Sequence, residues 1–234
     1  MEKQRIDKFL SNQLLLSRNE IRTGIKKGYA AVNGNISKDF SQIIDPRKDE
    51  ITYCGKKVDY KKYVYIMLNK PAGVLSASSD KNRKTVLDLV PGSLRRKGLS
   101  VVGRLDKDTT GLLLMTDDGG FAHKCISPKS KIEKSYIVEL DCDINADIIG
   151  LFKKGVVLAD GYKCRPAVLQ KLENRIVRVI ITEGKYHQIK RMFGAVSIGV
   201  NRLHRERIGS LCLPENLASG ECVEVEQEVL KQFF

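Results

Sequence analysis

Apolar residues at the start of the chain recur with the period of an α-helix. Ile6, Phe9 and Leu10 stand three and four positions apart, so they predict a helix with one apolar face. Ser17 followed three residues later by Glu20 is the residue pair of a capping box, which predicts the start of a second helix. The chain therefore begins with two short amphipathic helices.

A β-hairpin is predicted directly after the second helix. Gly28 is a typical residue at the end of a helix, and residues 29–32 have the composition of a strand. The pair Asn33 and Gly34 accepts the positive φ values of a tight type I′ turn. We therefore expect the chain to reverse at this pair.

Beyond residue 61 the apolar runs have the length of strands, and helical patterns are few. Strands are predicted over residues 63–68, 99–102, 111–116, 132–140 and 175–181. Helices are predicted over residues 121–126, 146–153 and 187–196. This pattern predicts an α+β protein with a small domain over residues 1–60 and a larger domain over residues 61–234.

The charge balance narrows the class of partner. The 234 residues include 41 Lys and Arg against 28 Asp and Glu, which gives a net charge of +13 at pH 7. Such a surplus attracts polyanions, and counterion release from phosphates adds salt-sensitive affinity, so nucleic acid is the natural partner. The alternative interpretation is a basic surface that only keeps the protein soluble.

Other functional classes find no support in the sequence. Apolar runs stay far below the roughly 20 residues needed to cross a bilayer, and the first residues lack the apolar segment of a secretion signal. We therefore expect a cytoplasmic protein. The six cysteines are widely spaced and accompanied by only three His, so we expect buried free thiols rather than a zinc site or disulfides.

The second predicted helix carries a basic face. Arg18, Arg22 and Lys26 are spaced by four residues, which suits contact with the phosphates and shape of RNA. Three segments resemble the S4 RNA-binding domain: RIDKFL at residues 5–10, SRNE at 17–20 and VNG at 32–34. The resemblance implies that Arg5 joins these three residues in binding RNA. An amphipathic helix pair with solvent-exposed arginines is the alternative interpretation.

A single carboxylate occupies the loop between two predicted strands. Asp106 lies after the strand at 99–102 and before the strand at 111–116, and loops mounted on rigid strands often carry catalytic groups. However, Asp106 is flanked by Arg104 and Lys107, and an Asp in that setting is more often part of a surface ion pair.

Four segments resemble the pseudouridine synthases, in the order of that family: NKPAG at residues 69–73, GRLDKDTTGLL at 103–113, EKSYIV at 133–138 and EGKYHQIKRMF at 183–193. The family's essential catalytic carboxylate corresponds to Asp106. With the S4-like start, the resemblance covers nearly the whole chain and points to the branch that modifies small-subunit ribosomal RNA. It implies a catalytic domain whose central mixed, largely antiparallel sheet has flanking helices and forms the floor of a cleft.

The resemblance also implies roles for residues around Asp106. Lys190, where many relatives carry Arg, is expected to pair with Asp106 as a point charge rather than a bidentate clamp. Tyr136 would stack on the uracil and assist proton movement, and Arg104 would fill the space that a flipped base leaves. Other residues expected to bind substrate are Leu105, Thr109, Ile180, His187, Gln188 and Arg191. The strand pattern alone is equally compatible with core positions for Tyr136 and Ile180.

The implied reaction isomerises uridine to pseudouridine. It breaks the bond from uracil N1 to ribose C1′ and joins uracil C5 to C1′ without net redox change, so no cofactor or metal is expected. The implied substrate is uridine 516 of 16S ribosomal RNA, in the RNA or in an assembling small subunit, and the protein is expected to be a monomer. The alternatives are a related synthase acting on 23S ribosomal RNA and a non-catalytic RNA-binding protein of ribosome assembly.

Overall fold

The computed structural model describes residues 3–231, which divide into two units. The first unit consists of two segments of the chain, the residues up to Val64 and the separate stretch Ser93–Gly98. The second comprises Tyr65–Gly92 and the chain from Leu99 onward.

Both predicted N-terminal helices are present. Helix α1 spans Ile6–Gln13 and helix α2 spans Arg18–Lys26. Ser17 caps α2, since its hydroxyl accepts a hydrogen bond from the Glu20 amide at 3.2 Å. The Glu20 carboxylate in turn accepts one from the Ser17 amide at 2.7 Å. The predicted capping box is therefore confirmed.

The predicted hairpin is also confirmed. Strands β2 (Ala30–Val32) and β3 (Asn35–Ser37) pair antiparallel, and the turn residues Asn33 and Gly34 have φ angles of 50° and 81°. The other strands of this unit are β1 (Gln4–Arg5), β4 (Ile43–Ile44), β5 (Ile51–Tyr53) and β6 (Lys56–Lys57). The hairpin joins β5 and β6 in a four-stranded sheet, while β1 pairs with β4.

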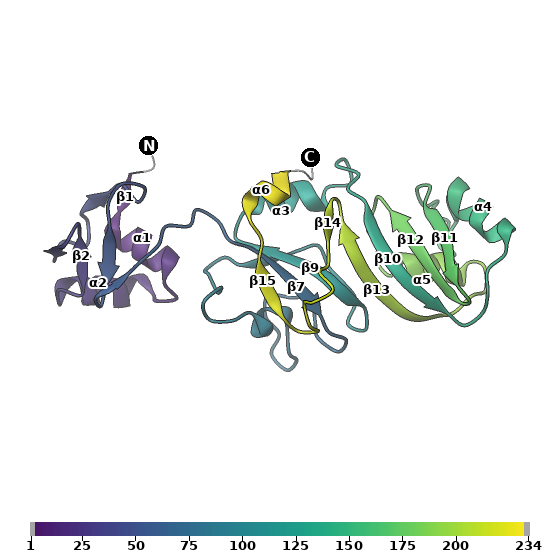
Figure 1. Ribbon diagram of the computed structural model, residues 1–234, viewed down its shortest axis with the longest axis horizontal. Helices are drawn as coiled ribbons and strands as arrows, with labels where there is room; N and C mark the ends of the chain where they lie inside the picture. Colours follow the sequence, from purple (N-terminus) through teal and green to yellow (C-terminus); the bar gives the residue numbers. More distant parts are fainter. Residues whose placement is uncertain (1–2, 232–234) are drawn as a thin grey trace. The chain divides into compact units, whose positions relative to one another are not determined.

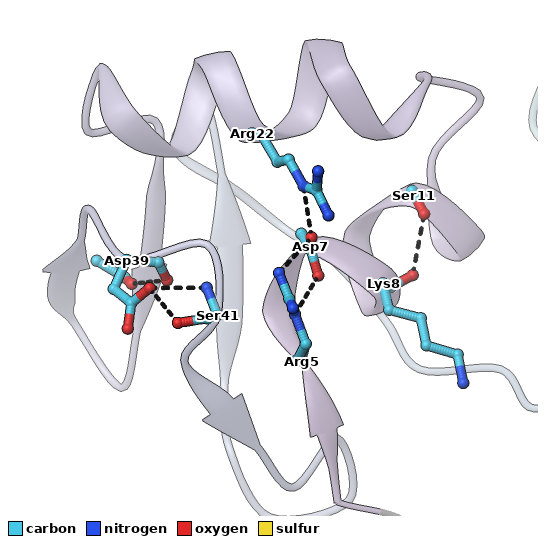
Figure 2. Close-up of polar contacts among 8 residues, drawn as sticks. Arg5, Asp7, Lys8, Ser11, Arg22, Asp39 and Ser41 are labelled. Atoms are coloured by element: carbon cyan, nitrogen blue, oxygen red, sulfur yellow. Dashed lines mark hydrogen bonds and ion pairs between the residues drawn. The ribbon is translucent and has the colours of Figure 1, made fainter.

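The carboxylate of Asp7 is buried in the first unit and is held by two arginines. It accepts hydrogen bonds from Arg22 Nε at 2.8 Å and from Arg5 Nε and Nη2 at 3.1 and 3.0 Å (Figure 2). Burial alone would raise the pKa of Asp7, but the hydrogen bonds and charges of Arg22 and Arg5 outweigh it and hold the pKa below its ordinary value. This network joins β1, α1 and α2.

A nine-stranded mixed sheet forms the centre of the second unit (Figure 1). Its main order is β11, β12, β10, β13, β9, β7, β15, with β14 beside β13 and β8 beside β9. Its strands are β7 (Tyr65–Lys70), β8 (Ser100–Val102), β9 (Thr110–Thr116), β10 (Lys134–Leu140), β11 (Val168–Glu173), β12 (Ile176–Ile181), β13 (Val200–Ile208), β14 (Leu211–Cys212) and β15 (Cys222–Glu224). Among the described strands only β9 and β13 pair in parallel. The expected mixed, largely antiparallel sheet is thus confirmed.

Short helices flank this sheet. They are η1 (Val86–Leu89, a 3₁₀ helix), α3 (Gly119–Ile126), α4 (Ala146–Lys154), α5 (Gln188–Gly194) and α6 (Gln227–Lys231). Helix α4 packs against β11 at one edge of the sheet (Figure 1). The three predicted helices of this unit correspond to α3, α4 and α5, whereas α6 was not predicted. The α+β fold class is confirmed.

Gly111 determines how closely β9 approaches β13. Its φ is 100°, and a Cβ atom there would lie 2.3 Å from the backbone oxygen of Arg205. Only glycine fits both the positive φ and this contact. Gly111 therefore allows the parallel pairing that brings the Arg205 region of β13 beside the start of β9.

The structure corrects one prediction about the cysteines. Cys125 and Cys164 are buried as expected, but Cys54, Cys142 and Cys212 are exposed, and all six are free thiols. Within residues 3–231 no helix is long and apolar enough to cross a membrane.

Candidate active site

A cavity of about 760 Å³ opens over one face of the large sheet. Lys134 and Tyr136 of β10 contribute to its lining, together with Ile181 of β12 and Arg205 of β13. Because side chains alternate along a strand, Lys134 and Tyr136 share one face of β10. The sheet therefore provides the floor of a cleft, as expected.

Asp106 lies in the β8–β9 loop at this cavity. Its side chain is 27% exposed, and its Oδ1 atom lies 3.5 Å from Nε2 of His187. Ser76 supports the preceding residue, because its hydroxyl donates to the Leu105 oxygen at 2.8 Å and accepts from the Leu105 amide at 3.1 Å. The carboxylate is thus presented to the cavity by an anchored loop.

A buried lysine anchors the other end of the loop. Lys70 is fully buried, and its Nζ donates hydrogen bonds of 2.9 to 3.1 Å to the backbone oxygens of Pro71, Lys107 and Thr109. Burial lowers the pKa of Lys70 to about 8, although the charges of Asp108 and Asp106 oppose this change. Lys70 belongs to the NKPAG segment, to which the sequence assigned no role.

Tyr136 and Arg205 are direct neighbours across β10 and β13. A register irregularity between Ser135 and Tyr136 precedes their pairing, and bulges of this kind re-aim side chains near active sites. Arg205 Nη1 lies 3.5 Å from the Tyr136 hydroxyl, and Arg205 Nε donates to the backbone oxygen of Leu112 at 2.7 Å. Arg205 therefore contacts Tyr136 within the cavity floor.

In this structure Lys190 is paired with Asp108 rather than with Asp106. Lys190 Nζ donates a hydrogen bond to Asp108 Oδ2 at 2.5 Å instead. This hydrogen bond, opposed by burial, and the charge of Lys190 hold the pKa of Asp108 below its ordinary value. Asp106 has His187 as its closest basic neighbour among the described residues.

His187 and Gln188 reach the cavity through an unusual backbone turn. His187 precedes α5 with a left-handed φ of 49°, and its ring stacks on Tyr186 with centroids 3.8 Å apart. Tyr186 is 71% exposed. Gln188 is buried and donates to Glu183 Oε1 at 2.8 Å, so its side chain braces the cavity wall.

Glu183 is a buried carboxylate that accepts three hydrogen bonds, one of which is the bond from Gln188. It also accepts hydrogen bonds from the Tyr162 hydroxyl at 2.8 Å and from the Arg165 amide at 2.9 Å. Its position at the end of β12 joins the cavity wall to the segment before β11. These contacts give Glu183 a structural role.

Two predicted pocket residues are placed elsewhere. Ile181 lines the cavity in place of Ile180, because the two residues point to opposite faces of β12. Arg191 pairs with Asp160 instead of lining the cavity. The other predicted residues of the pocket do share its lining, namely Arg104, Leu105, Asp106, Thr109, Tyr136, His187 and Gln188.

The predicted RNA-binding residues form a separate group in the first unit. Arg5, Arg22 and Lys26 surround the ring of Phe40, with their charged groups 5.7, 5.2 and 5.5 Å from its centroid. Arg18 lies one turn before Arg22 on α2. Arg5 and Arg22 also hold Asp7, so they have a structural role in addition to any contact with RNA.

Sequence reasoning assigned no role to two cations of the cavity, Lys134 and Arg205. Lys134 stands two residues before Tyr136, so the strand period could have placed it on the same face. Arg205 had no such local signal, because its place depends on the pairing of β13 with both β9 and β10.

Comparisons with known proteins agree with this geometry. A family profile described as RNA pseudouridylate synthase matches residues 64–195, and one described as S4 domain matches residues 4–51. The chain is 40% identical to ribosomal small subunit pseudouridine synthase A of Escherichia coli and of Salmonella typhimurium, over 96% of this chain and 97% of each relative. It is similar to a crystal structure of a pseudouridylate synthase, with 34% identity, a TM-score of 0.69 and coverage of 99% of this chain and 100% of that one.

Proposed function

The chain belongs to the RNA pseudouridine synthases, and we propose that its substrate is uridine 516 of 16S ribosomal RNA. The coarser conclusion, pseudouridine synthase activity on RNA, follows from the family. The finer proposal is supported by the 40% identity to small-subunit synthases over nearly the full length of both chains. The S4 domain supplies a second RNA-binding unit.

The observation that carries the chemical proposal is the position of Asp106 at the cavity. A carboxylate on an anchored loop faces a floor that contains an aromatic ring and an apolar side chain. The volume of about 760 Å³ accommodates a nucleotide taken out of its stack. We propose that Asp106 acts at ribose C1′, as nucleophile or as electrostatic stabiliser, when the base detaches.

The remaining cavity residues have supporting roles in this proposal. Tyr136 stacks on the uracil and its hydroxyl assists proton movement at the sugar. Arg104 is exposed on the loop beside Asp106, where it can occupy the space that the flipped base leaves in the RNA. Lys190 exchanges its partner Asp108 for Asp106 when RNA is bound, which would give the carboxylate an adjacent cation.

The reaction needs only groups that the chain itself contains. The electron pair of the N1–C1′ bond leaves with the base, the base turns, and C5 forms the new bond to C1′. The proton on C5 is lost and N1 gains a proton, so atoms and electrons balance without a cofactor. We further propose that the protein acts as a monomer on 16S ribosomal RNA or on an assembling small subunit.

Carbodiimide mapping of pseudouridine tests this proposal directly. Naked ribosomal RNA and assembling small subunits would be incubated with wild-type protein or with Asp106→Asn. We expect one new site, at uridine 516, that requires Asp106. A site in 23S ribosomal RNA would keep the chemistry and change the substrate, whereas tight binding without any new site would favour an assembly factor.

A further inference from the structure

The cavity floor contains a buried arginine that has no acidic partner. Arg205 is 3% exposed and donates to the Leu112 backbone oxygen and to the Tyr136 hydroxyl. Its Nη2 atom is buried without a hydrogen-bond partner. Among the described residues, no carboxylate forms a salt bridge with it, so the positive charge of Arg205 is not compensated by contact.

A second cation faces the same cavity. Lys134 Nζ donates to the backbone oxygen of Ile132 at 2.8 Å, and no ion pair is formed by this ammonium within the described residues. Burial and then the positive charge of Arg205 lower the pKa of Lys134 to about 8. Cys125 lies close to Lys134, but burial raises the pKa of its thiol to about 12, so it supplies no anion at neutral pH.

Three carboxylates on or near the surrounding strands, Glu206, Glu183 and Asp106, have other polar partners. Glu206 accepts hydrogen bonds from Ser135 and Arg178, which places its carboxylate on the sheet face opposite Tyr136. Glu183 is held by the three hydrogen bonds described above. Asp106 lines the same cavity, but its close neighbour is His187.

Two uncompensated cations in a cavity wall are costly for the folded protein. Removing a charge from water carries a large penalty unless an opposite charge or several hydrogen bonds replace the water. A buried donor without a partner, such as Arg205 Nη2, also calls for a functional explanation. A ligand that carries or develops negative charge would provide one.

We propose that Lys134 and Arg205 stabilise the negative charge that forms on the uracil when its bond to the ribose breaks. The electron pair of the N1–C1′ bond moves into the base, where O2 and O4 share the charge. The charge disappears when C5 bonds to C1′ and N1 is protonated. This inference rests on the proposed function and names the groups that hold the detached base.

The location of the two cations favours the base over a phosphate as the anionic group. Arg205 and Tyr136 belong to the buried floor, where a flipped base would enter. The RNA backbone stays at the mouth, where Arg104 and Lys185 are exposed and can meet phosphates. Preorganised charges in a water-poor site act strongly on charge that develops during the reaction.

A pair of small molecules tests the charge preference independently of any RNA substrate. Barbiturate has the ring size of uracil but carries a negative charge at neutral pH, whereas uracil is neutral. We expect the full-length protein to bind barbiturate at least about tenfold more tightly than uracil, because hydrogen bonds to charged groups are the stronger ones. Calorimetry or ligand-observed NMR would measure both affinities.

Three variants connect this preference to the two cations. Lys134→Met and Arg205→Met should reduce the ratio of barbiturate affinity to uracil affinity towards one, whereas Lys134→Arg should retain the wild-type ratio. Arg178→Met removes a cation from the opposite sheet face and should leave the preference unchanged. Equal affinities for barbiturate and uracil, no detectable barbiturate binding, or an unchanged preference in both folded Met variants would overturn the proposal. If Arg205→Met fails to fold, the affinity ratio of Lys134→Met alone tests the proposal, and an unchanged ratio overturns it.

Turnover of RNA provides the second readout. Conversion replaces the hydrogen on C5, so release of tritium from RNA containing [5-³H]uridine follows the reaction. Lys134→Met should slow single-turnover release about 10- to 100-fold while RNA affinity stays within about threefold. Weaker RNA affinity with an unchanged rate would instead indicate a phosphate contact and would overturn the proposal. If wild-type protein releases no tritium from 16S RNA but prefers barbiturate, the proposed substrate fails and the cation pair stands.

Discussion

Lys190 donates its hydrogen bond to Asp108, two residues beyond Asp106 on the same loop. The Asp108 side chain is 69% exposed, so the pair is accessible to solvent and its net free energy is small. The lysine side chain is flexible and carries a compact charge, which makes an exchange of partner inexpensive. Asp108 therefore keeps Lys190 at the loop that carries Asp106, from which the proposed exchange would bring it to that carboxylate when RNA enters the cavity.

This exchange predicts opposite effects of two substitutions. Asp108→Asn should leave the rate of pseudouridine formation within about threefold, because Lys190 remains free to reach Asp106. Lys190→Met should lower the rate about 10- to 100-fold, the effect of losing a hydrogen bond to a charged group. Single-turnover tritium release measures both. A larger loss for Asp108→Asn than for Lys190→Met would show that Asp108 is the functional partner.

Asp106→Asn should reduce turnover by roughly 10³-fold or more, because it removes the carboxylate charge and the nucleophilic oxygen while keeping the side-chain volume. RNA affinity should remain close to that of the wild type. Asp80→Asn, which changes an exposed-loop carboxylate outside the cavity lining, is the matched control. Filter binding and tritium release on the same preparations would separate the two effects. Turnover by Asp106→Asn at a rate close to that of the wild type would show that Asp106 is not the catalytic carboxylate.

The two helices and the first hairpin of the first unit were predictable because their signals are local, whereas β1, β4, β5 and β6 were not predicted. The capping box at Ser17 and the turn at Asn33 depend on residues within three positions of each other, and both are confirmed. The sheet face on which a strand residue lies is predicted less reliably, because a shift of one residue places its side chain on the opposite face. Ile180 and Ile181 show this: the resemblance pointed to Ile180, whereas Ile181, on the opposite strand face, lines the cavity.

The candidate site also depends on contacts that no short segment encodes. Arg205 enters the cavity because β13 pairs with β10 and with β9, whose residues lie far away in the chain. The partner of Lys190 was missed because the loop carries two carboxylates, Asp106 and Asp108, and the resemblance selected Asp106. Several segments that line the cavity were therefore identified from sequence, whereas the arrangement of their side chains depends on the fold.

Gly111→Ala should destabilise the second unit by about 2–4 kcal/mol, because the added Cβ meets the Arg205 backbone and the positive φ becomes strained. Gly73→Ala is a matched control. Gly73 also has a positive φ, of 85°, but an added Cβ would meet no atom within 4 Å, so only the backbone strain remains. Urea denaturation of both full-length variants gives the difference. Equal decreases in the free energy of unfolding for the two variants would show that β9 and β13 move apart to accommodate the Cβ atom without loss of stability.

RNA binding by the first unit can be tested without disturbing its fold. Arg22 holds Asp7, so Arg18 and Lys26 are the better residues to change. Arg18→Gln with Lys26→Gln should weaken RNA affinity about tenfold and lower the salt slope by about 1.5 to 2, because two phosphate contacts are lost. Lys56→Gln with Lys57→Gln removes the same charge from β6 and should have a smaller effect. Equal effects of the two double variants would mean that net charge, rather than the α2 face, determines affinity.

Asp7 should make the stability of the first unit depend on acidic pH. Its folded-state pKa lies below the unfolded value because Arg22 and Arg5 outweigh the effect of burial. The stabilisation is therefore complete above the unfolded pKa of about 3.9 and is lost as pH falls through the lower folded pKa. Asp7→Asn should remove this dependence and cost about 1–3 kcal/mol at pH 7, discounted because both arginines are more than a third exposed. Hydrogen exchange of amides in α1 and α2 of the full-length protein measures both effects. Equal protection from hydrogen exchange in wild type and Asp7→Asn at pH 7 would mean that the ion pairs of Arg5 and Arg22 with Asp7 make no net contribution to stability.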